Sequence, residues 1–377
     1  MRTSFHNKPF DEGTKIKLEI FRRYLREWIP VFLTVSPDTS WCTQVNIFDL
    51  FCGPGKDLEG TPGSPLIIQE EIKSYCQKNR SLKKDIVVKL FFNDRQGEYI
   101  EVLKKEIENN RCPEACCKFS YHTVEFGLVV EELLPVMEKS GSANLLLLDQ
   151  FGVKNISPEL VTKLLRAGAS DVLFFISSSA IRRFAEESAF KEMFPGKDIK
   201  SVEYDVIHRY LTGCFRDTAQ LPDAYFAPFS IKKGSNIYGL IFATRHELGI
   251  EKFLRVCWDL DSATGEANYN IDGDVAWGNQ PALFSEMNVP TKKQVFRKEL
   301  LEHIIQYSPT NRNVYRFGLR EGFPSRECAA TLKELQNDGK IKTEFLNKHG
   351  MPRKGTFYLK KKKDIIRIVG RSTNGDQ

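Results

Sequence analysis

The sequence predicts an α/β fold in which a mainly parallel sheet carries helices on both faces. Short unbroken apolar segments alternate with helical segments along the first half of the chain, and polar residues directly follow several of the apolar segments. Strands of a parallel sheet are buried on both faces and therefore appear as unbroken apolar runs. A later pair of strand-like segments, separated by a short polar turn, indicates that a hairpin completes the sheet.

The predicted strands follow a regular rhythm. They are residues 45–49, 86–92, 118–124, 143–148 and 171–176, followed by the hairpin segments 225–231 and 237–244. Helical segments separate the parallel strands, and a longer helical region precedes the hairpin. In open sheets of this kind, ligands bind beyond the carboxyl ends of the parallel strands. The polar residues at those ends are therefore the candidate functional residues.

Three helices have recognisable boundaries. In residues 14–29, apolar residues recur every four positions, and Pro30 is expected to help end the helix. Ser64 and Ser157 each precede a proline, which suits a capping serine followed by a proline in the first turn. The basic residues of the first helix cover much of its remaining circumference, and they form either a solvated face or a nucleic-acid contact.

The most informative stretch is the turn after the first strand. Asp49 ends the strand, and Gly53 and Gly55 follow in the run Asp-Leu-Phe-Cys-Gly-Pro-Gly. Glycines permit positive φ and close approach of a ligand to the backbone, while the Asp49 carboxylate can accept hydrogen bonds from an ammonium or hydroxyl group. A dinucleotide fold is the alternative, but the third glycine and the immediate helix of its fingerprint are absent. The turn resembles the first motif of class I S-adenosylmethionine (SAM) methyltransferases.

The methyltransferase resemblance gives the other strand ends roles in cofactor binding. It implies that carboxylates near Asp94 accept the ribose hydroxyls, that Glu125 accepts the adenine amino group, and that Phe126 covers the adenine ring. The alternative for each acid is a solvated carboxylate that caps a nearby helix. The predicted cofactor-binding residues are Asp49, Gly53, Gly55, Asp94, Glu125 and Phe126.

The fourth strand ends in Asp149-Gln150-Phe151-Gly152. Amino-methyltransferases carry an acid or Asn, two prolines and an aromatic residue here, so Asp149 and Phe151 are the candidate catalytic residues that orient the target group. Gln150 and Gly152 stand where prolines are usual, and a looser turn holds its acceptor less well, which puts turnover in question. A cytosine-C5 mechanism needs a cysteine after a proline, and the chain has no Pro-Cys pair.

Composition indicates a globular protein large enough for two domains. The chain has 377 residues, of which 41% are hydrophobic and 28% charged, and its apolar runs are far shorter than the roughly 18 residues that span a bilayer. The polar N-terminus lacks a signal sequence, so we expect a cytoplasmic protein with reduced thiols among its nine cysteines.

Only Cys112, Cys116 and Cys117 cluster, in a spacing poorly suited to metal. We expect no metal, and a metal-dependent nuclease would lack a recognisable ligand pattern.

Positive charge is concentrated at the C-terminus. Residues 291–377 carry about 20 Lys and Arg against 9 Asp and Glu, whereas the rest of the chain is mildly acidic. Helices 292–307 and 325–335 precede a predicted hairpin of strands 340–345 and 355–360, an order that indicates a winged helix whose second predicted helix reads a nucleic-acid groove. Protein docking and a merely solubilising tail are the alternatives. The predicted phosphate contacts are Arg326, Lys333, Lys348, Arg353 and Lys354.

Several short motifs together resemble the three-Cys-motif partner family, TcmP. They are Thr14-Lys15-x-Lys17-Leu18 with Tyr24 and Trp28, Phe48 to Gly55, Gly63-Ser64-Pro65, Asp149-x-Phe151-Gly152, and Ala243 to His246 with Gly249. The resemblance covers nearly the whole chain and implies a Rossmann-like class I methyltransferase sheet, a C-terminal winged helix and association with a separate three-cysteine, radical-SAM-like iron–sulfur protein. The family turn reads Asp-Pro-Phe-Gly, so Gln150 departs from it, as does the Asn93-Asp94 end of the second strand.

These observations predict three regions and leave two functions open. Residues 1–262 are expected to form a methyltransferase-like SAM-binding domain, residues 263–290 a linker, and residues 291–377 a basic winged-helix domain. The expected function is that of a SAM-dependent methyltransferase-like protein acting on DNA or RNA in association with the three-cysteine partner. The alternative is a non-catalytic adaptor that presents nucleic acid to that partner.

Overall fold

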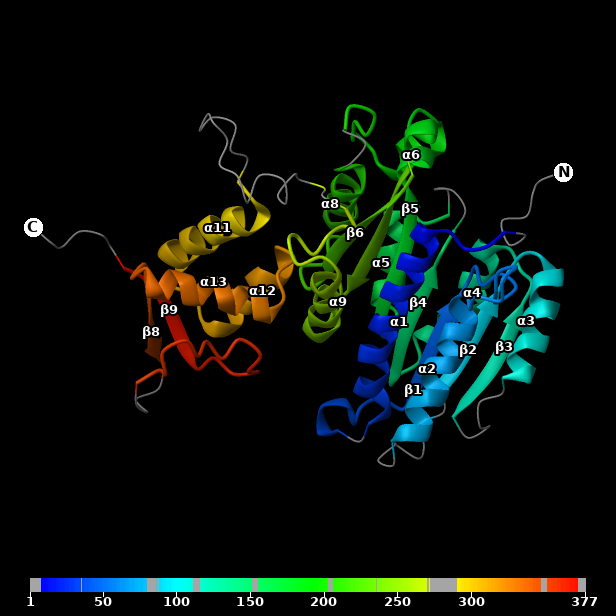
Figure 1. Ribbon diagram of the computed structural model, residues 1–377, viewed down its shortest axis with the longest axis horizontal. Coiled ribbons are helices and arrows are strands. Elements are labelled where there is room, and N and C mark those ends of the chain that lie inside the picture. The colour runs from blue at the N-terminus through cyan, green and yellow to red at the C-terminus, as the bar shows by residue number, and fades with distance from the viewer. Residues whose placement is uncertain are drawn as a thin grey trace, which may run out of the picture. The chain divides into compact units, whose positions relative to one another are not determined.

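A computed structural model describes most of the chain, as two compact units (Figure 1). The described residues are 8–34, 36–79, 86, 88–110, 116–150, 155–202, 206–234, 236–269, 271, 290–346 and 351–371. The units are Met1–Val256 and Cys257–Gln377, so the division falls six residues before the predicted end of the first domain. None of the helices in the described part of the chain is both long and apolar enough to cross a membrane.

The first unit is built on a mixed seven-stranded sheet with the order β3-β2-β1-β4-β5-β7-β6. Its strands are β1 (Gln44–Asp49), β2 (Val88–Asn93), β3 (Cys117–His122), β4 (Ser142–Leu148), β5 (Ala169–Ser177), β6 (Tyr225–Lys233) and β7 (Asn236–Thr244). The first five strands are parallel, and β7 runs antiparallel to both β5 and β6. The predicted α/β fold, its five parallel strands and its closing hairpin are confirmed.

Helices cover both faces of this sheet. They are α1 (Glu12–Leu33), α2 (Ser64–Lys78), α3 (Gly97–Asn109), α4 (Phe126–Met137), α5 (Pro158–Arg166), α6 (Ser178–Phe184), α7 (Ser188–Met193), α8 (Ile207–Ala219) and α9 (Glu247–Leu260). Buried side chains of α4, α5 and α8 pack on one face of the sheet. On the other face α1 and α2 lie side by side, as Figure 1 shows in blue.

Two predicted helix boundaries are wrong in detail. Pro30 lies inside α1, which continues to Leu33. A proline lacks the N–H donor and crowds the carbonyl four residues earlier, but its own carbonyl still accepts, here from the Thr34 N–H at 3.2 Å. Ser64 is the first residue of α2 and makes no capping bond, whereas Gly63 occupies the cap position. Ser157 does cap α5, accepting from the Leu160 N–H at 3.2 Å.

A buried carboxylate on β5 anchors α1 to the sheet. Asp171 accepts hydrogen bonds from the Tyr24 hydroxyl at 2.7 Å and the Trp28 indole N–H at 2.9 Å on one oxygen, and from the Thr244 hydroxyl at 2.5 Å on the other. Burial raises the pKa of Asp171, an effect that the Thr244 and Tyr24 hydroxyls oppose. A Cβ on Gly249 would stand only 3.0 Å from the Thr244 hydroxyl. Four residues of the TcmP-like motifs thus surround one side chain.

Ion pairs join α1 to α2. Arg22 and Arg26 both reach Glu71, at 2.8 and 2.7 Å, and Arg22 also pairs with Glu70 at 3.0 Å. These contacts hold the pKa of Glu71 below its usual range even though burial opposes them. Part of the basic face of the first helix is therefore paired within the protein rather than directed to a nucleic acid.

The described residues of the second unit that follow position 290 form three helices and a two-stranded antiparallel sheet. The elements are α11 (Lys292–Tyr307), α12 (Asn311–Arg320), α13 (Ser325–Asn337), β8 (Ile341–Phe345) and β9 (Ile366–Gly370). An isolated bridge pairs Thr310, just before α12, with Arg367. The helix α12 was not predicted, and α13 begins at Ser325, where the predicted helix begins.

The predicted strand partner of β8 is wrong. β8 pairs with β9, not with residues 355–360, which form no strand although Phe357 and Leu359 are buried in alternation. Tyr358 between them has a left-handed φ of 52°, and its carbonyl accepts from the side chain of Asn311 at 3.0 Å. The buried Asn311 also accepts the Ile365 N–H at 2.8 Å, so one side chain replaces a sheet ladder in this loop.

The described residues of the predicted linker, 263–269, 271 and 290, belong to the second unit. Trp258 donates to the Gly322 carbonyl at 2.9 Å, and its ring lies against Gly265, where a Cβ would approach within 2.5 Å. Lys292, at the start of α11, pairs with Glu266 at 2.6 Å. Residues 272–289 of that linker lie outside the described residues.

We expect Asp171→Ala to lower the free energy of unfolding of the first unit by about 3–5 kcal/mol, because three buried donors lose their acceptor. Asp171→Asn keeps one carbonyl oxygen and should cost less. Urea unfolding checks both variants. The matched control is Asp223→Ala: this half-exposed aspartate pairs with Arg245 at 2.7 Å, and its loss should cost under about 1 kcal/mol. Equal losses at the two positions would contradict an anchoring role for Asp171.

Candidate functional site

The turn after β1 has the backbone geometry that its glycines permit. Gly53 and Gly55 have φ values of 59° and 92°, in the left-handed region that favours glycine. The Gly55 carbonyl accepts the Gly63 N–H at 2.7 Å, which closes the intervening loop. A Cβ on Gly63 would approach that carbonyl oxygen at 3.1 Å. Both glycines are buried, and a Cβ on Gly55 would meet the Leu103 side chain at 2.7 Å, so they allow the loop to turn tightly against α3 at the carboxyl end of the central strand.

Asp49 is a buried carboxylate without a well-formed hydrogen bond. It is 0% exposed, and neither of its oxygens makes a hydrogen bond of good geometry with a described residue. Burial raises its pKa to about 7; the nearby Ser64 hydroxyl opposes this shift, and the charges of Asp149 and Asp94 add to it. A buried acceptor that lacks partners is costly unless a ligand satisfies it.

Asp94 lies beside the glycine turn. Its carboxylate accepts the Gly53 N–H at 3.1 Å and the Gln96 N–H at 2.9 Å, so it fixes the turn as well as facing the strand ends. The preceding residue, Asn93, is buried and links the segments that follow β1 and β3: its amide donates to the Leu50 carbonyl at 3.3 Å and to the Val124 carbonyl at 3.1 Å. Asn93 is therefore structural, and Asp94 is the acid available to a ligand.

Glu125 and Phe126 lie at the start of α4. Glu125 is exposed and caps the helix, accepting the Gly127 N–H at 2.8 Å through one oxygen. Phe126 is 6% exposed and stacks on Phe51 with ring centroids 4.8 Å apart. The capping role that was the alternative for Glu125 is present, and Phe126 is largely a core residue. Their contacts with adenine stay a prediction.

Asp149 forms an ion pair that the sequence did not suggest. The Lys17 ammonium on α1 contacts its Oδ2 and lies 4.7 Å from the centre of the Phe175 ring on β5. The next residue, Gln150, is buried and accepts the Asn155 N–H at 3.1 Å. Phe151, the second candidate catalytic residue, lies outside the described residues.

The structure brings three of the predicted carboxylates together. Asp94 and Asp149 both act electrostatically on Asp49, so the strand ends form a locally negative site. Among the described residues, Lys17 forms an ion pair with Asp149. Such a site suits a cationic ligand with hydrogen-bond donors. Among the described residues, no group of three or more His, Cys, Asp or Glu side chains is arranged to hold a metal ion.

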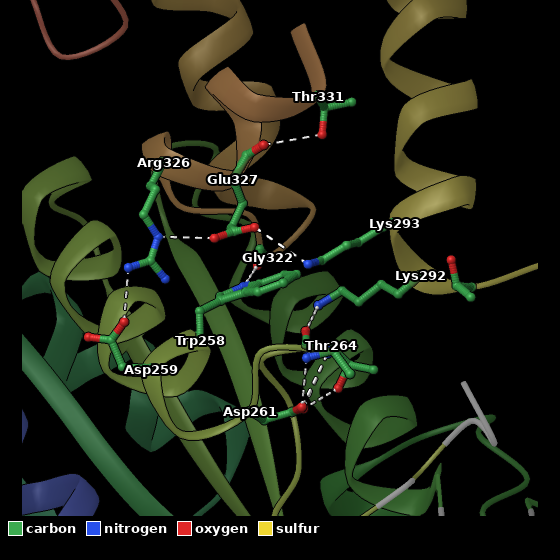
Figure 2. Close-up of polar contacts among 12 residues, drawn as sticks. Trp258, Asp259, Asp261, Thr264, Lys292, Lys293, Gly322, Arg326, Glu327 and Thr331 are labelled. Atoms are coloured by element: carbon green, nitrogen blue, oxygen red, sulfur yellow. Dashed lines mark hydrogen bonds and ion pairs between the residues drawn. The ribbon is translucent and has the colours of Figure 1, made fainter. Parts of the chain in front are cut away.

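In the second unit, Arg326 is engaged by acidic neighbours. Figure 2 shows its guanidinium between Asp259 and Glu327, each at 3.0 Å. Glu327 also approaches Lys293 at 3.7 Å. Although Arg326 is more than half exposed, a phosphate would have to displace carboxylates from it.

The other predicted basic contacts lie on α13 and on the loop before β9. Lys333, Arg353 and Lys354 are exposed. The Gly355 N–H donates to the Gln336 side chain at 3.0 Å, which ties the loop to α13 one turn beyond Lys333. Lys348 lies outside the described residues.

Comparisons with known proteins give weak structural similarities and no sequence match. No family model matches the chain, and no curated protein matches it. The complex of Trm1 from Pyrococcus horikoshii with S-adenosyl-L-methionine aligns with a TM-score of 0.36 and 11% identity, over 63% of this chain and 56% of Trm1, so the match spans just over half of that protein. The O-methyltransferase TomG from Streptomyces achromogenes aligns with a TM-score of 0.33 and 10% identity, over 65% of this chain and 98% of TomG. An O-methyltransferase from Bacillus cereus in complex with SAH aligns with a TM-score of 0.35 and 10% identity, over 63% and 91% of the two chains.

We expect Asp49 to make stability fall as the pH rises. Its folded pKa, about 7, lies above the ordinary 3.8, so between these values the folded chain holds a proton that the unfolded chain has lost. Stability is then lost progressively up to pH 7 and stays low above it. Asp49→Asn removes this dependence and should gain about 2–3 kcal/mol on wild type between pH 5 and pH 8. Urea unfolding at the two pH values measures the gain.

Asp223→Asn is the control for this measurement. Arg245 lowers the pKa of Asp223, so the stabilisation that this carboxylate contributes is complete above its unfolded pKa and does not change between pH 5 and pH 8. A pH dependence of Asp49→Asn that parallels wild type would show that Asp49 is ionised without cost in the folded chain.

Proposed function

We propose that the protein is a SAM-dependent methyltransferase-like protein acting on nucleic acid. The observation that supports this most strongly is Asp49, a fully buried carboxylate without a well-formed hydrogen bond, at the carboxyl end of the central strand. SAM carries an ammonium group and a sulfonium, and an unsatisfied buried carboxylate with two further acids nearby suits such a cation.

The residues around Asp49 have the chemistry to hold the rest of the cofactor. The left-handed backbone of Gly53 and Gly55 keeps the turn close to the strand end, and Asp94 has acceptor capacity for ribose hydroxyls. Glu125 uses one oxygen as a helix cap and is exposed, so the other oxygen is available to an amino group, with Phe126 beside it. When bound, SAM supplies an activated methyl group, and the protein's task is to align the acceptor and handle its proton.

Asp149 is the residue proposed to orient that acceptor. It is 30% exposed at its side chain, and Lys17 occupies only its Oδ2. The Oδ1 atom makes no hydrogen bond with a described residue and could accept one from the target group. Phe151 is proposed to stack on the target base, in line with the motif Asp149-x-Phe151-Gly152.

The second unit is proposed to be a winged helix that binds DNA or RNA. Its order of three helices followed by two antiparallel strands, with the bridge from Thr310 to Arg367 between the first two helices, suits that architecture. Lys333, Arg353 and Lys354 are the proposed phosphate contacts on α13 and its neighbouring loop. Arg326 contributes less because Asp259 and Glu327 already hold it.

The proposed family is TcmP, with a three-cysteine iron–sulfur protein as partner and a cytoplasmic location. A second candidate function is a non-catalytic adaptor that presents nucleic acid to this partner. Gln150 in place of a proline favours it, because a turn without prolines holds its acceptor less well.

Calorimetry with SAM and with SAH tests the cofactor proposal. We expect both to bind wild type and Asp49→Ala to weaken SAM binding about 10- to 100-fold, because a charge-assisted hydrogen bond is worth about 1.5–3 kcal/mol. Asp223→Ala should bind as wild type does. Absence of binding by either compound at millimolar concentration, or equal affinity in Asp49→Ala, contradicts a SAM site here.

Salt titration of the full chain tests the nucleic-acid proposal. Binding of fluorescent duplex DNA, duplex RNA and a single strand of equal length should weaken steeply with salt, and Lys333→Gln should reduce the logarithmic slope by about 1. Arg353→Gln and Lys354→Gln should act alike, whereas Arg326→Gln should change the slope less because its charge is internally paired. An affinity that does not depend on salt is incompatible with phosphate contacts.

Transfer of labelled methyl groups separates the enzyme from the adaptor. The substrates are DNA and RNA from cells that lack this protein, incubated with labelled SAM. A methyltransferase incorporates label without the three-cysteine partner, and Asp149→Asn reduces that incorporation. Label that appears only with the partner, and is unchanged by Asp149→Asn, supports the adaptor.

A further inference from the structure

Lys17 occupies an unusual place for a lysine. Its side chain is only 12% exposed, and its ammonium contacts Asp149 at the end of β4 and lies over the Phe175 ring of β5. Removing an ammonium from water is costly unless a carboxylate and a ring face compensate it, as they do here. A lysine needed only for solubility would lie on the opposite side of α1.

The helix α1 fixes where Lys17 points. Lys17, Tyr24 and Trp28 are seven and eleven residues apart, close to whole numbers of helical turns, so they share the face of α1 that meets the sheet. Tyr24 and Trp28 are bound to Asp171, and Asp171 and Phe175 lie four residues apart on the same face of β5. The Asp171 anchor therefore also sets the position of the Lys17 ammonium.

The turn that carries Asp149 lacks the prolines that would stiffen it. Gln150 restrains part of the turn through its bond to the Asn155 N–H, but this bond does not touch the Asp149 side chain. Among the described residues, Lys17 is the hydrogen-bonding partner of that carboxylate, and it binds Oδ2 alone. The remaining oxygen, Oδ1, is left for a ligand.

The geometry points to Lys17 as a positioning residue, which holds Asp149 in one rotamer through Oδ2 so that Oδ1 can accept a hydrogen bond from the target group. This inference rests on the proposed methyl transfer. Lys17 acts through Asp149 and does not touch the target. The contact with Lys17 replaces the restraint on Asp149 that a proline-rich turn would give. Such a restraint matters because an acceptor misplaced by about 1 Å can lower the rate by roughly two orders of magnitude.

Kinetics of Lys17→Met, Lys17→Arg and Asp149→Asn test this role. With labelled SAM and nucleic acid from cells that lack the protein, Lys17→Met should lower kcat about 10- to 100-fold, leave the calorimetric Kd for SAM within about twofold, and leave Tm nearly unchanged. Lys17→Arg should recover part of the rate. The control is Lys15→Met, because Lys15 is half exposed and pairs with the neighbouring Glu12 at 3.3 Å, and its kcat should match wild type.

The double variant separates positioning from an independent role. If Lys17 acts through Asp149, Lys17→Met combined with Asp149→Asn should be no slower than Asp149→Asn alone. Losses that multiply, or a full kcat in Lys17→Met, overturn the inference.

Crystal structures of wild type and Lys17→Met give a readout that does not require turnover. We expect one Asp149 rotamer in wild type and a displaced or divided side chain in the variant. The same single rotamer in both overturns the inference whatever the activity. A rotamer lost in the variant of a protein that transfers no methyl group supports positioning while the proposed function fails, so the two failures remain distinct.

Discussion

The first unit depends on one buried carboxylate more than on any other polar group. Asp171 gathers donors from α1 and from the end of β7, segments 147 and 73 residues away in the chain. Leaving any of these donors unpaired in the core would cost more than the bond itself contributes, so the network specifies how α1 packs on the sheet. Tyr24, Trp28 and Thr244 come from separate short motifs of the sequence, and in the fold they all donate a hydrogen bond to this side chain.

The candidate site shows the opposite condition. Asp171 is buried and accepts hydrogen bonds on both oxygens, whereas Asp49, buried on a neighbouring part of the same sheet, has no well-formed hydrogen bond with any residue that the structure describes. A fold can tolerate a buried, unsatisfied carboxylate when binding of a ligand offsets the cost of burying it. For this reason, carboxylates that lack hydrogen bonds or have shifted pKa values concentrate at functional sites. The contrast between these two aspartates separates a structural acid from a candidate binding acid without reference to any related protein.

Sequence patterns predicted the sheet well because strands buried on both faces give unbroken apolar runs, and they predicted which acids follow those strands. They could not predict the Lys17–Asp149 pair, since its members are 132 residues apart and only the packing of α1 joins them. The wrong prediction of the strand that pairs with β8 has a similar origin. The apolar residues Phe357 and Leu359 alternate as they would in a strand, but the side chain of Asn311, which is distant in the sequence, donates a hydrogen bond to the Tyr358 carbonyl.

The bond between Gln336 and Gly355 has a consequence for molecular recognition. In the proposed nucleic-acid interface, this bond secures the loop that carries Arg353 and Lys354 before a nucleic acid binds. Ordering long basic side chains and a free loop during association would consume part of the interaction energy, and a loop already tethered to a helix avoids much of that entropic loss. Selectivity at this surface would then come from a preformed spacing of charges, and a polyanion whose phosphates do not match that spacing would be disfavoured.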